Sequence, residues 1–142
     1  MGHMRDVAYI ALGSNLGDRA AWLTTARAAI AALPACSLLS VTPAEETAPI
    51  GPVDQGPFLN QMLALETDLE PEALLDSLLA IESAAGRERG VRWGPRTLDL
   101  DIVAFERLTF QSPRLTIPHP ELPNRDFWRR ELAALRNEHE QR

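Results

Sequence analysis

Residues 92–103 read RWGPRTLDLDIV and decide the fold, because an arginine- and glycine-rich loop leads straight into a strand that carries two acids. From Thr97 to Phe105 the residues read as a β-strand, in which side chains two positions apart point to the same face. Asp99 and Asp101 therefore share one face. The opposite face is apolar and is expected in the core; its members are Leu98, Leu100, Ile102 and Ala104.

The two acids have two possible meanings. Asp has poor strand propensity, and two carboxylates on one short strand repel each other unless a cation or arginines lie between them. Carboxylate oxygens are ligands for hard cations, and cation-neutralised carboxylates recur in phosphoryl transfer. The pair therefore indicates a metal or phosphate site, and the alternative is a structural salt bridge to Arg96.

Length and composition indicate a single domain over residues 1–142, with enough chain to bury one core. One cysteine, Cys36, excludes an internal disulfide and a multi-cysteine zinc site. The apolar run Val7–Leu12 is too short to span a membrane, so we expect a cytoplasmic protein without a membrane partner. We interpret Met1–Met4 as a cloning remnant.

All fourteen basic residues are arginine, which excludes a Schiff-base lysine, a P-loop lysine and the strand lysine of protein kinases. The net charge of −6 argues against a general nucleic-acid surface. Four arginines nevertheless gather just before the acidic strand, where guanidinium groups suit phosphate oxygens, although a solvated charged loop is the other interpretation. They are Arg87, Arg89, Arg92 and Arg96.

The apolar periodicity predicts an α+β fold with the ferredoxin-like order βαββαβ, in which two helices cover one face of a sheet that contains antiparallel strands. The expected main strands are Val7–Leu12, Ser37–Glu46, Phe58–Thr67 and Thr97–Phe105. The expected helices are Arg19–Leu33, a second one opened by Pro71 and ended by Gly86, and a C-terminal one from about Asp126. We interpret Gly13–Gly17 as a plain strand-to-helix turn, since the lysine and the second half of a phosphate-loop motif are missing.

Five motifs in order resemble the 6-hydroxymethyl-7,8-dihydropterin pyrophosphokinase family. The resemblance runs from about Val7 to Phe127, and its most specific part is Arg96–Asp101. The motifs are YIALGSNLG at 9–17, ETAPIG at 46–51, FLN at 58–60, the stretch 92–103, and LTIPHP at 115–120 with Asn124 and Arg125.

The resemblance implies transfer of the β,γ-pyrophosphoryl group of ATP to the pterin hydroxymethyl group in folate biosynthesis, with release of AMP. It implies two Mg²⁺ ions on Asp99 and Asp101, catalytic roles for these acids with Arg87 and Arg96, small-molecule partners only, and a monomer. On the ATP side it places Glu82, Arg87, Arg89, Trp93, Arg96, Ile102, Arg114, Thr116, His119 and Arg125. On the pterin side it places Thr47, Ala48, Ile50, Phe58, Asn60, Trp93 and Phe127.

Several alternatives stay open. Phe58 and Phe127 are expected on the two faces of the pterin ring, yet both could be core residues, and His119 could simply fix a turn. The region 128–142 departs most from the family pattern, since Glu131 stands where the family has a proline. A non-catalytic pterin- or nucleotide-binding homologue is therefore the second hypothesis. A glycosidase with paired carboxylates is the third, although neighbouring arginines would lower the pKa of the acid it needs protonated.

Overall fold

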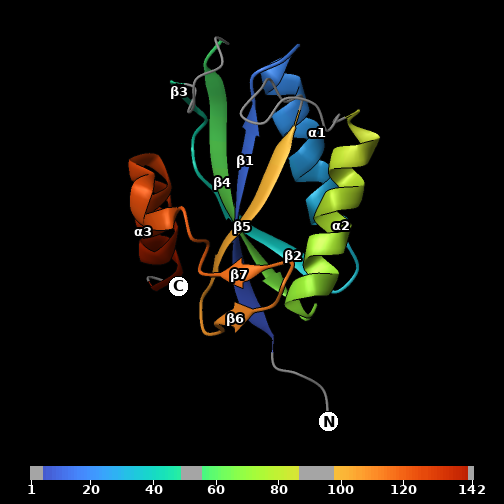
Figure 1. Cartoon of the computed structure of the whole chain (residues 1–142), viewed down its shortest axis with the longest axis vertical. Coiled ribbons are helices and arrows are strands. Elements are labelled where there is room, and N and C mark those ends of the chain that lie inside the picture. The colour runs from blue at the N-terminus through green and yellow to red at the C-terminus, as the bar shows by residue number, and fades with distance from the viewer. Residues whose placement is uncertain (1–4, 49–55, 87–97, 141–142) are drawn as a thin grey trace.

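The computed structural model describes residues 5–48, 56–86 and 98–140, and shows an α+β protein built on one main antiparallel sheet (Figure 1). The strands are β1 (Asp6–Ser14), β2 (Cys36–Val41), β3 (Glu45–Thr47), β4 (Phe58–Thr67), β5 (Asp99–Phe105), β6 (Phe110–Gln111) and β7 (Thr116–Ile117). The helices are α1 (Arg19–Ala31), α2 (Pro71–Ala84), the 3₁₀ turn η1 (Leu122–Asn124) and α3 (Asp126–Glu140).

The main sheet has the order β2-β4-β1-β5, with β3 also paired to β4. All of its pairings are antiparallel. The first strand thus lies between the third and the fourth main strands, and the third separates the first from the second. This arrangement confirms the predicted ferredoxin-like core.

Helices cover both faces of the sheet. Figure 1 shows α1 and α2 on one side and α3 on the other. The α1–α2 side buries side chains such as Ile10, Leu23, Leu65, Leu74 and Ile102, whereas the α3 side buries Tyr9, Met62, Ala64, Trp128, Leu132 and Leu135. No helix in the described ranges is long and apolar enough to cross a membrane.

The helix ends follow the expected local chemistry. The Asp18 side chain accepts a hydrogen bond from the Ala21 amide and caps α1. Pro71 occupies the first turn of α2, where a missing N–H costs nothing. Gly86 has φ +79° just beyond the C-terminal end of α2, which is a conformation that glycine adopts without steric cost.

The expected strand Ser37–Glu46 is wrong, because the chain forms two strands there. Between them Pro43 has no N–H to donate to a ladder. Thr42 instead connects the chain to β4 at this point. Its amide donates to the Met62 carbonyl, and its hydroxyl accepts from the Met62 amide at 2.9 Å. The short strand β3 is therefore a separate edge piece, held by the far end of β4.

Two further expectations need correction. Gly13 lies within β1 and not in a turn, since β1 continues to Ser14. Ala104 lies in the α3-side core and not with Ile102, because the pairing of β1 with β5 shifts by one residue between Tyr9 and Ile10. Such a bulge reverses the inward and outward alternation beyond it.

Candidate functional site

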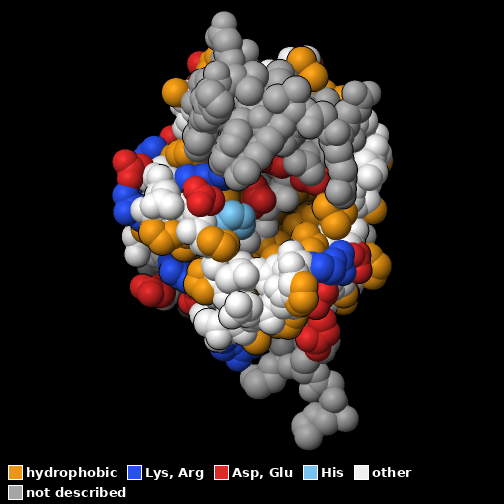
Figure 2. Space-filling model, in the orientation of Figure 1, with side chains coloured by type: hydrophobic (Ala, Val, Ile, Leu, Met, Phe, Trp, Pro, Cys, Tyr) orange, Lys and Arg blue, Asp and Glu red, His pale blue; other side chains and the backbone are white. Residues whose placement is uncertain are grey.

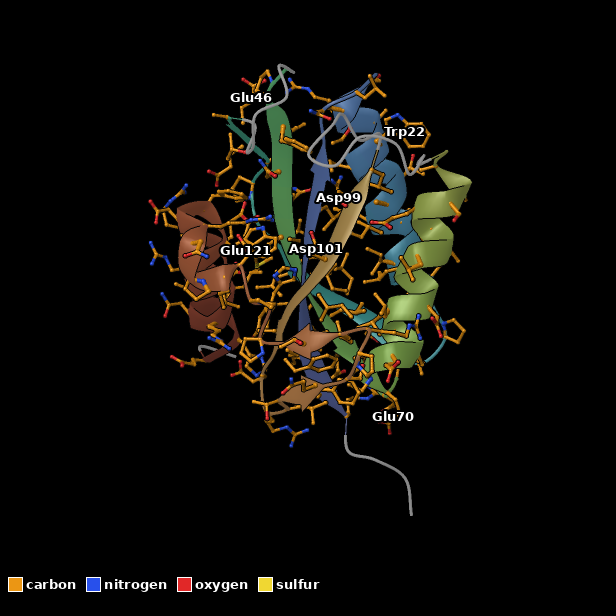
Figure 3. The ribbon with its side chains drawn as sticks, in the orientation of Figure 1. Trp22, Glu46, Glu70, Asp99, Asp101 and Glu121 are labelled. Atoms are coloured by element: carbon orange, nitrogen blue, oxygen red, sulfur yellow. The ribbon has the colours of Figure 1, made fainter. Side chains whose placement is uncertain are left out.

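The two acids of β5 lie on the α3 side of the sheet. Asp99 pairs with Gly13 and Asp101 with Ala11, so both carboxylates project from the same face, over the smallest side chains of β1. Figure 3 shows the two residues one after the other along β5. Both are half-buried, in contrast to the buried Leu100 between them. The predicted sharing of one face is confirmed.

Gly13 allows a close approach of side chains beside this pair. Its register partners are Asp99 on one side and Asn60 on the other, so the three residues form a row across β5, β1 and β4. A Cβ atom at Gly13 would lie 3.3 Å from Asn60 Oδ1 and 3.5 Å from Phe58 Cδ1. The lack of a side chain at Gly13 therefore lets the side chains of Asn60 and Phe58 lie close to the β1 backbone.

Asn60 is held in one orientation although it lies in a largely apolar strand. Its side chain is 7% exposed, and Nδ2 donates to the Thr47 hydroxyl at 2.5 Å. Thr47 on β3 pairs with Phe58 on β4, which brings these three residues together at one end of the sheet. Ala48 follows β3 directly and is exposed.

His119 stands next to the acids, between β7 and η1. Its Nε2 lies 3.8 Å from Asp101 Oδ1, and its Nδ1 accepts a hydrogen bond from the Glu121 amide at 3.0 Å. Because Nδ1 is an acceptor, the ring proton of neutral His119 is on Nε2, facing Asp101. A histidine side chain beside acidic side chains is visible where this face is hollowed (Figure 2).

The His119 ring is fixed from two further directions. Its backbone amide donates to the Val103 carbonyl at 2.8 Å, which attaches the segment after β7 to β5. Its ring meets the Trp128 ring edge-to-face at a centroid distance of 5.0 Å. Burial, and after it the positive charge of Arg125, lower the His119 pKa, so the ring is neutral at pH 7.

This lowered pKa predicts a loss of stability in acid. Unfolded histidine binds a proton below about pH 6.5, whereas folded His119 resists it, so its contribution to the free energy of unfolding falls as pH falls through that range. We expect His119→Gln to lose less stability than wild type between pH 7 and pH 5 in urea titrations. His139→Gln, at the far end of α3, is the control. Parallel pH profiles for wild type and His119→Gln would contradict the expectation.

The start of α3 closes the site on the side of His119. Arg125 lies over the Trp128 ring, 4.3 Å from its centroid. Phe127 packs its ring against Trp128 at 6.4 Å and is half-buried against the α3-side core. Phe127 therefore lies at the edge of the α3-side core, whereas Phe58 is half-buried with its Cδ1 beside Gly13.

Three residues expected on the ATP side make other contacts within the described part of the chain. Glu82 is 3% exposed on α2, and its Oε2 accepts from the Leu100 amide at 2.7 Å on the outer edge of β5. Ile102 is buried in the α1–α2 side of the core. Arg114 is exposed and pairs with Glu72 and Asp76 of α2. Their binding roles stay predictions, as does that of Thr116 in β7.

We expect Glu82→Ala to destabilise the fold. The change leaves the buried Leu100 amide without its acceptor, which should cost about 1–3 kcal/mol in the free energy of unfolding. Chemical denaturation measures this loss. The control is Glu72→Ala, which removes a partly exposed carboxylate from the same helix. Equal stability of the Glu82→Ala and Glu72→Ala variants would show that the hydrogen bond carries no such weight.

Other predicted site residues lie outside the described residues: Ile50, Arg87, Arg89, Trp93 and Arg96. Conversely, the sequence reasoning missed two residues. Gly13 allows the close approach of Asn60 and Phe58, and Trp128 supports the His119 ring. A glycine inside an apolar strand often marks close approach of other groups, so the signal for Gly13 was available. For Trp128 no signal beyond helical spacing existed.

The chain is similar to known proteins over most of its length. The family model described as 7,8-dihydro-6-hydroxymethylpterin-pyrophosphokinase matches residues 9–137. The 2-amino-4-hydroxy-6-hydroxymethyldihydropteridine pyrophosphokinase of Bacillus subtilis is 43% identical over 132 residues, which cover 93% of this chain and 79% of that protein. The protein of the same name from Pseudomonas aeruginosa is 46% identical over 127 residues, covering 89% and 78% respectively.

Proposed function

The chain belongs to the 7,8-dihydro-6-hydroxymethylpterin-pyrophosphokinase family, and on this premise we propose that it transfers the β,γ-pyrophosphoryl group of ATP to the hydroxymethyl group of 6-hydroxymethyl-7,8-dihydropterin. AMP is the second product, and the pyrophosphorylated pterin enters folate biosynthesis. The observation that carries this proposal is the row Asn60–Gly13–Asp99, which sets the polar side chain of Asn60 across one small residue from the paired carboxylates of β5.

The carboxylates fit a magnesium site. Mg²⁺ is bound in phosphoryl-transfer enzymes by one or two carboxylates together with phosphate oxygens and water. Asp99 and Asp101 supply two carboxylates on one face, and both remain partly exposed. When bound, two Mg²⁺ ions would neutralise charge that develops on the phosphates.

The residues around the acids serve to orient the phosphates. His119 presents its Nε2–H beside Asp101 as a neutral hydrogen-bond donor. Arg125, on the same side, supplies a guanidinium group that suits phosphate oxygens. We assign the same task to Thr116 and Arg114, and to Arg87, Arg89 and Arg96 of the basic loop. Release of Arg114 from Glu72 and Asp76 would be needed for its contact with ATP.

We assign the pterin to the surface next to Asn60 and Phe58, beside Gly13. A flat heterocycle stacks on aromatic faces and is oriented by a few polar groups. Phe58 and Phe127 supply the faces, and Asn60, fixed by Thr47, supplies a polar edge. Backbone groups near Thr47, Ala48 and Ile50, together with Trp93, complete the assignment. The hydroxymethyl oxygen then points toward the acids of β5.

An assay of AMP release tests the proposal directly. The purified protein is incubated with ATP, Mg²⁺ and 6-hydroxymethyl-7,8-dihydropterin, and the products are separated by chromatography. We expect AMP and the pyrophosphorylated pterin in equal amounts, and no AMP when the pterin is omitted. Binding of both substrates without AMP would favour the non-catalytic homologue instead. ADP in place of AMP would contradict pyrophosphoryl transfer.

A further inference from the structure

One carboxylic acid lies on the buried stripe of α3. Positions 128, 131, 132 and 135 follow the three- and four-residue spacing of a helix face, and three of them are Trp128, Leu132 and Leu135. The fourth is Glu131, which is 4% exposed. Among the described residues, no hydrogen-bond donor meets either of its carboxyl oxygens. A buried acid without a donor is costly when it is ionised.

Glu45 of β3 is the acidic neighbour of Glu131. Glu45 forms an ion pair with Arg130, whose Nη2 lies 3.0 Å from Glu45 Oε1. Burial, and after it the charge of Glu45, raise the pKa of Glu131 to about 8, so Glu131 carries its proton at pH 7. A protonated carboxyl group is a hydrogen-bond donor, and the Glu45 carboxylate is an acceptor.

The other surroundings of Glu131 are mainly apolar. The strands β1 and β4 present Ala11, Met62 and Ala64 to the α3 side. Tyr9 also lies on this face, and its hydroxyl donates to Glu106 at 2.9 Å, beside Arg136 of α3. The charges that act on Glu131 are thus Glu45 from β3 and Arg130 from α3.

Glu45 and Glu131 are both connected to residues that we assign to the pterin. Glu45 pairs with Asn60 across β3 and β4, and Thr47, two residues later on the same face, accepts the hydrogen bond from Asn60. Phe127 precedes Glu131 by four residues and therefore lies on the same face of α3. A hydrogen bond between Glu131 and Glu45 would thus join the helix that carries Phe127 to the strand that carries Thr47.

We propose that Glu131 is a positioning residue, which as a protonated acid donates a hydrogen bond to Glu45 and holds Phe127 and Thr47 in place for the pterin. This inference rests on the proposed function. Within residues 5–48, 56–86 and 98–140, the three-residue strand β3 pairs with one end of β4 alone, so a contact from α3 adds substantially to its attachment. Loss of the proton removes the donor and sets two carboxylates against each other. Pterin affinity should therefore fall as pH rises through about 8.

The test compares the pH dependence of pterin binding in four proteins: the wild type, the variants Glu131→Gln and Glu131→Leu, and the control Glu138→Gln. Calorimetry measures the Kd of 6-hydroxymethyl-7,8-dihydropterin at pH 7 and pH 9, with a non-hydrolysable ATP analogue present. Wild type and the control Glu138→Gln, an exposed acid of α3, should bind about 5- to 10-fold more weakly at pH 9, as expected for one lost hydrogen bond. Glu131→Gln keeps a donor and should show no such weakening. Any ionisation of the pterin itself affects all four proteins equally.

The variant Glu131→Leu separates positioning from packing. Leucine suits the apolar stripe but cannot donate, so stability should hold or rise while pterin binding weakens at both pH values and binding of the ATP analogue stays unchanged. Equal pH profiles for wild type and Glu131→Gln, or wild-type pterin affinity in Glu131→Leu, would overturn the proposal.

A measurement without ligand distinguishes this inference from the proposed function. Carbon-13 NMR of the side-chain carboxyl groups should show Glu131 titrating near pH 8 in wild type and at lower pH in Glu45→Gln. If these titrations occur but the wild type binds no pterin at any pH, the proposed function fails and the contact is structural only. If Glu131 titrates at the pH of an exposed acid while the pterin binds, only the positioning role is overturned.

Discussion

Asp99→Ala and Asp101→Ala should each reduce the rate of AMP formation by at least ~10²–10³-fold, since each change removes a charged group that acts where phosphate charge develops. The two side chains project from one face of β5 over Gly13 and Ala11, so neither substitution disturbs the apolar face that carries Leu100. We expect the free energy of unfolding to change little. Steady-state kinetics with saturating Mg²⁺ measure the effect, and chemical denaturation verifies the fold.

A matched control is Asp68→Ala, which removes an acid that forms an exposed ion pair with Arg5. Its turnover should stay at the wild-type level. If both β5 variants retained turnover within a few-fold of wild type, Asp99 and Asp101 would not be the metal ligands. The salt-bridge interpretation of the pair would then be preferred.

Phe127→Ala should weaken pterin binding by about 5- to 160-fold, equivalent to about 1–3 kcal/mol for the loss of one stacking face. The binding of ATP should change far less. Phe127 is half-buried and packs on Trp128 at a centroid distance of 6.4 Å, so some stability is lost as well. Separate titrations with the pterin and with an ATP analogue distinguish stacking from general damage.

The control for Phe127 is Phe110→Ala, because Phe110 is also half-buried but belongs to the α1–α2 side of the core. It should lower stability without selective loss of pterin binding. If Phe127→Ala instead lowered stability and left pterin affinity unchanged, Phe127 would be a core residue. Another side chain would then have to cover the second face of the ring.

Elements with regular apolar spacing were predictable from the sequence. The strand Phe58–Thr67 has the predicted bounds, and α1 and α2 begin at the predicted residues. The break between β2 and β3 had a local signal in Pro43, but the contact of Thr42 with Met62 at this break could not be predicted, because the two residues are distant in sequence. The bulge opposite Tyr9 and Ile10 was missed for the same reason, since it is a property of the pairing and not of β5 alone.

The site was predictable to a similar degree. Period-two spacing placed Asp99 and Asp101 together, and the resemblance brought His119 into consideration near them. The spacing could not show that His119 is attached to β5 through the Val103 carbonyl, or that Arg114 pairs with acids of α2. Such contacts join segments whose separation in sequence carries no local signal.

The lack of a side chain at Gly13 also bears on inhibitor resistance. Enzymes often escape a competitive inhibitor through a larger side chain that fills space used by the drug but not by the substrate. At Gly13 the first atom of any side chain would already lie 3.3 Å from Asn60 and 3.5 Å from Phe58, the residues assigned to the substrate itself. A substitution at Gly13 that blocked a compound bound there would also displace Asn60 and Phe58. Resistance through this position is therefore expected to reduce activity.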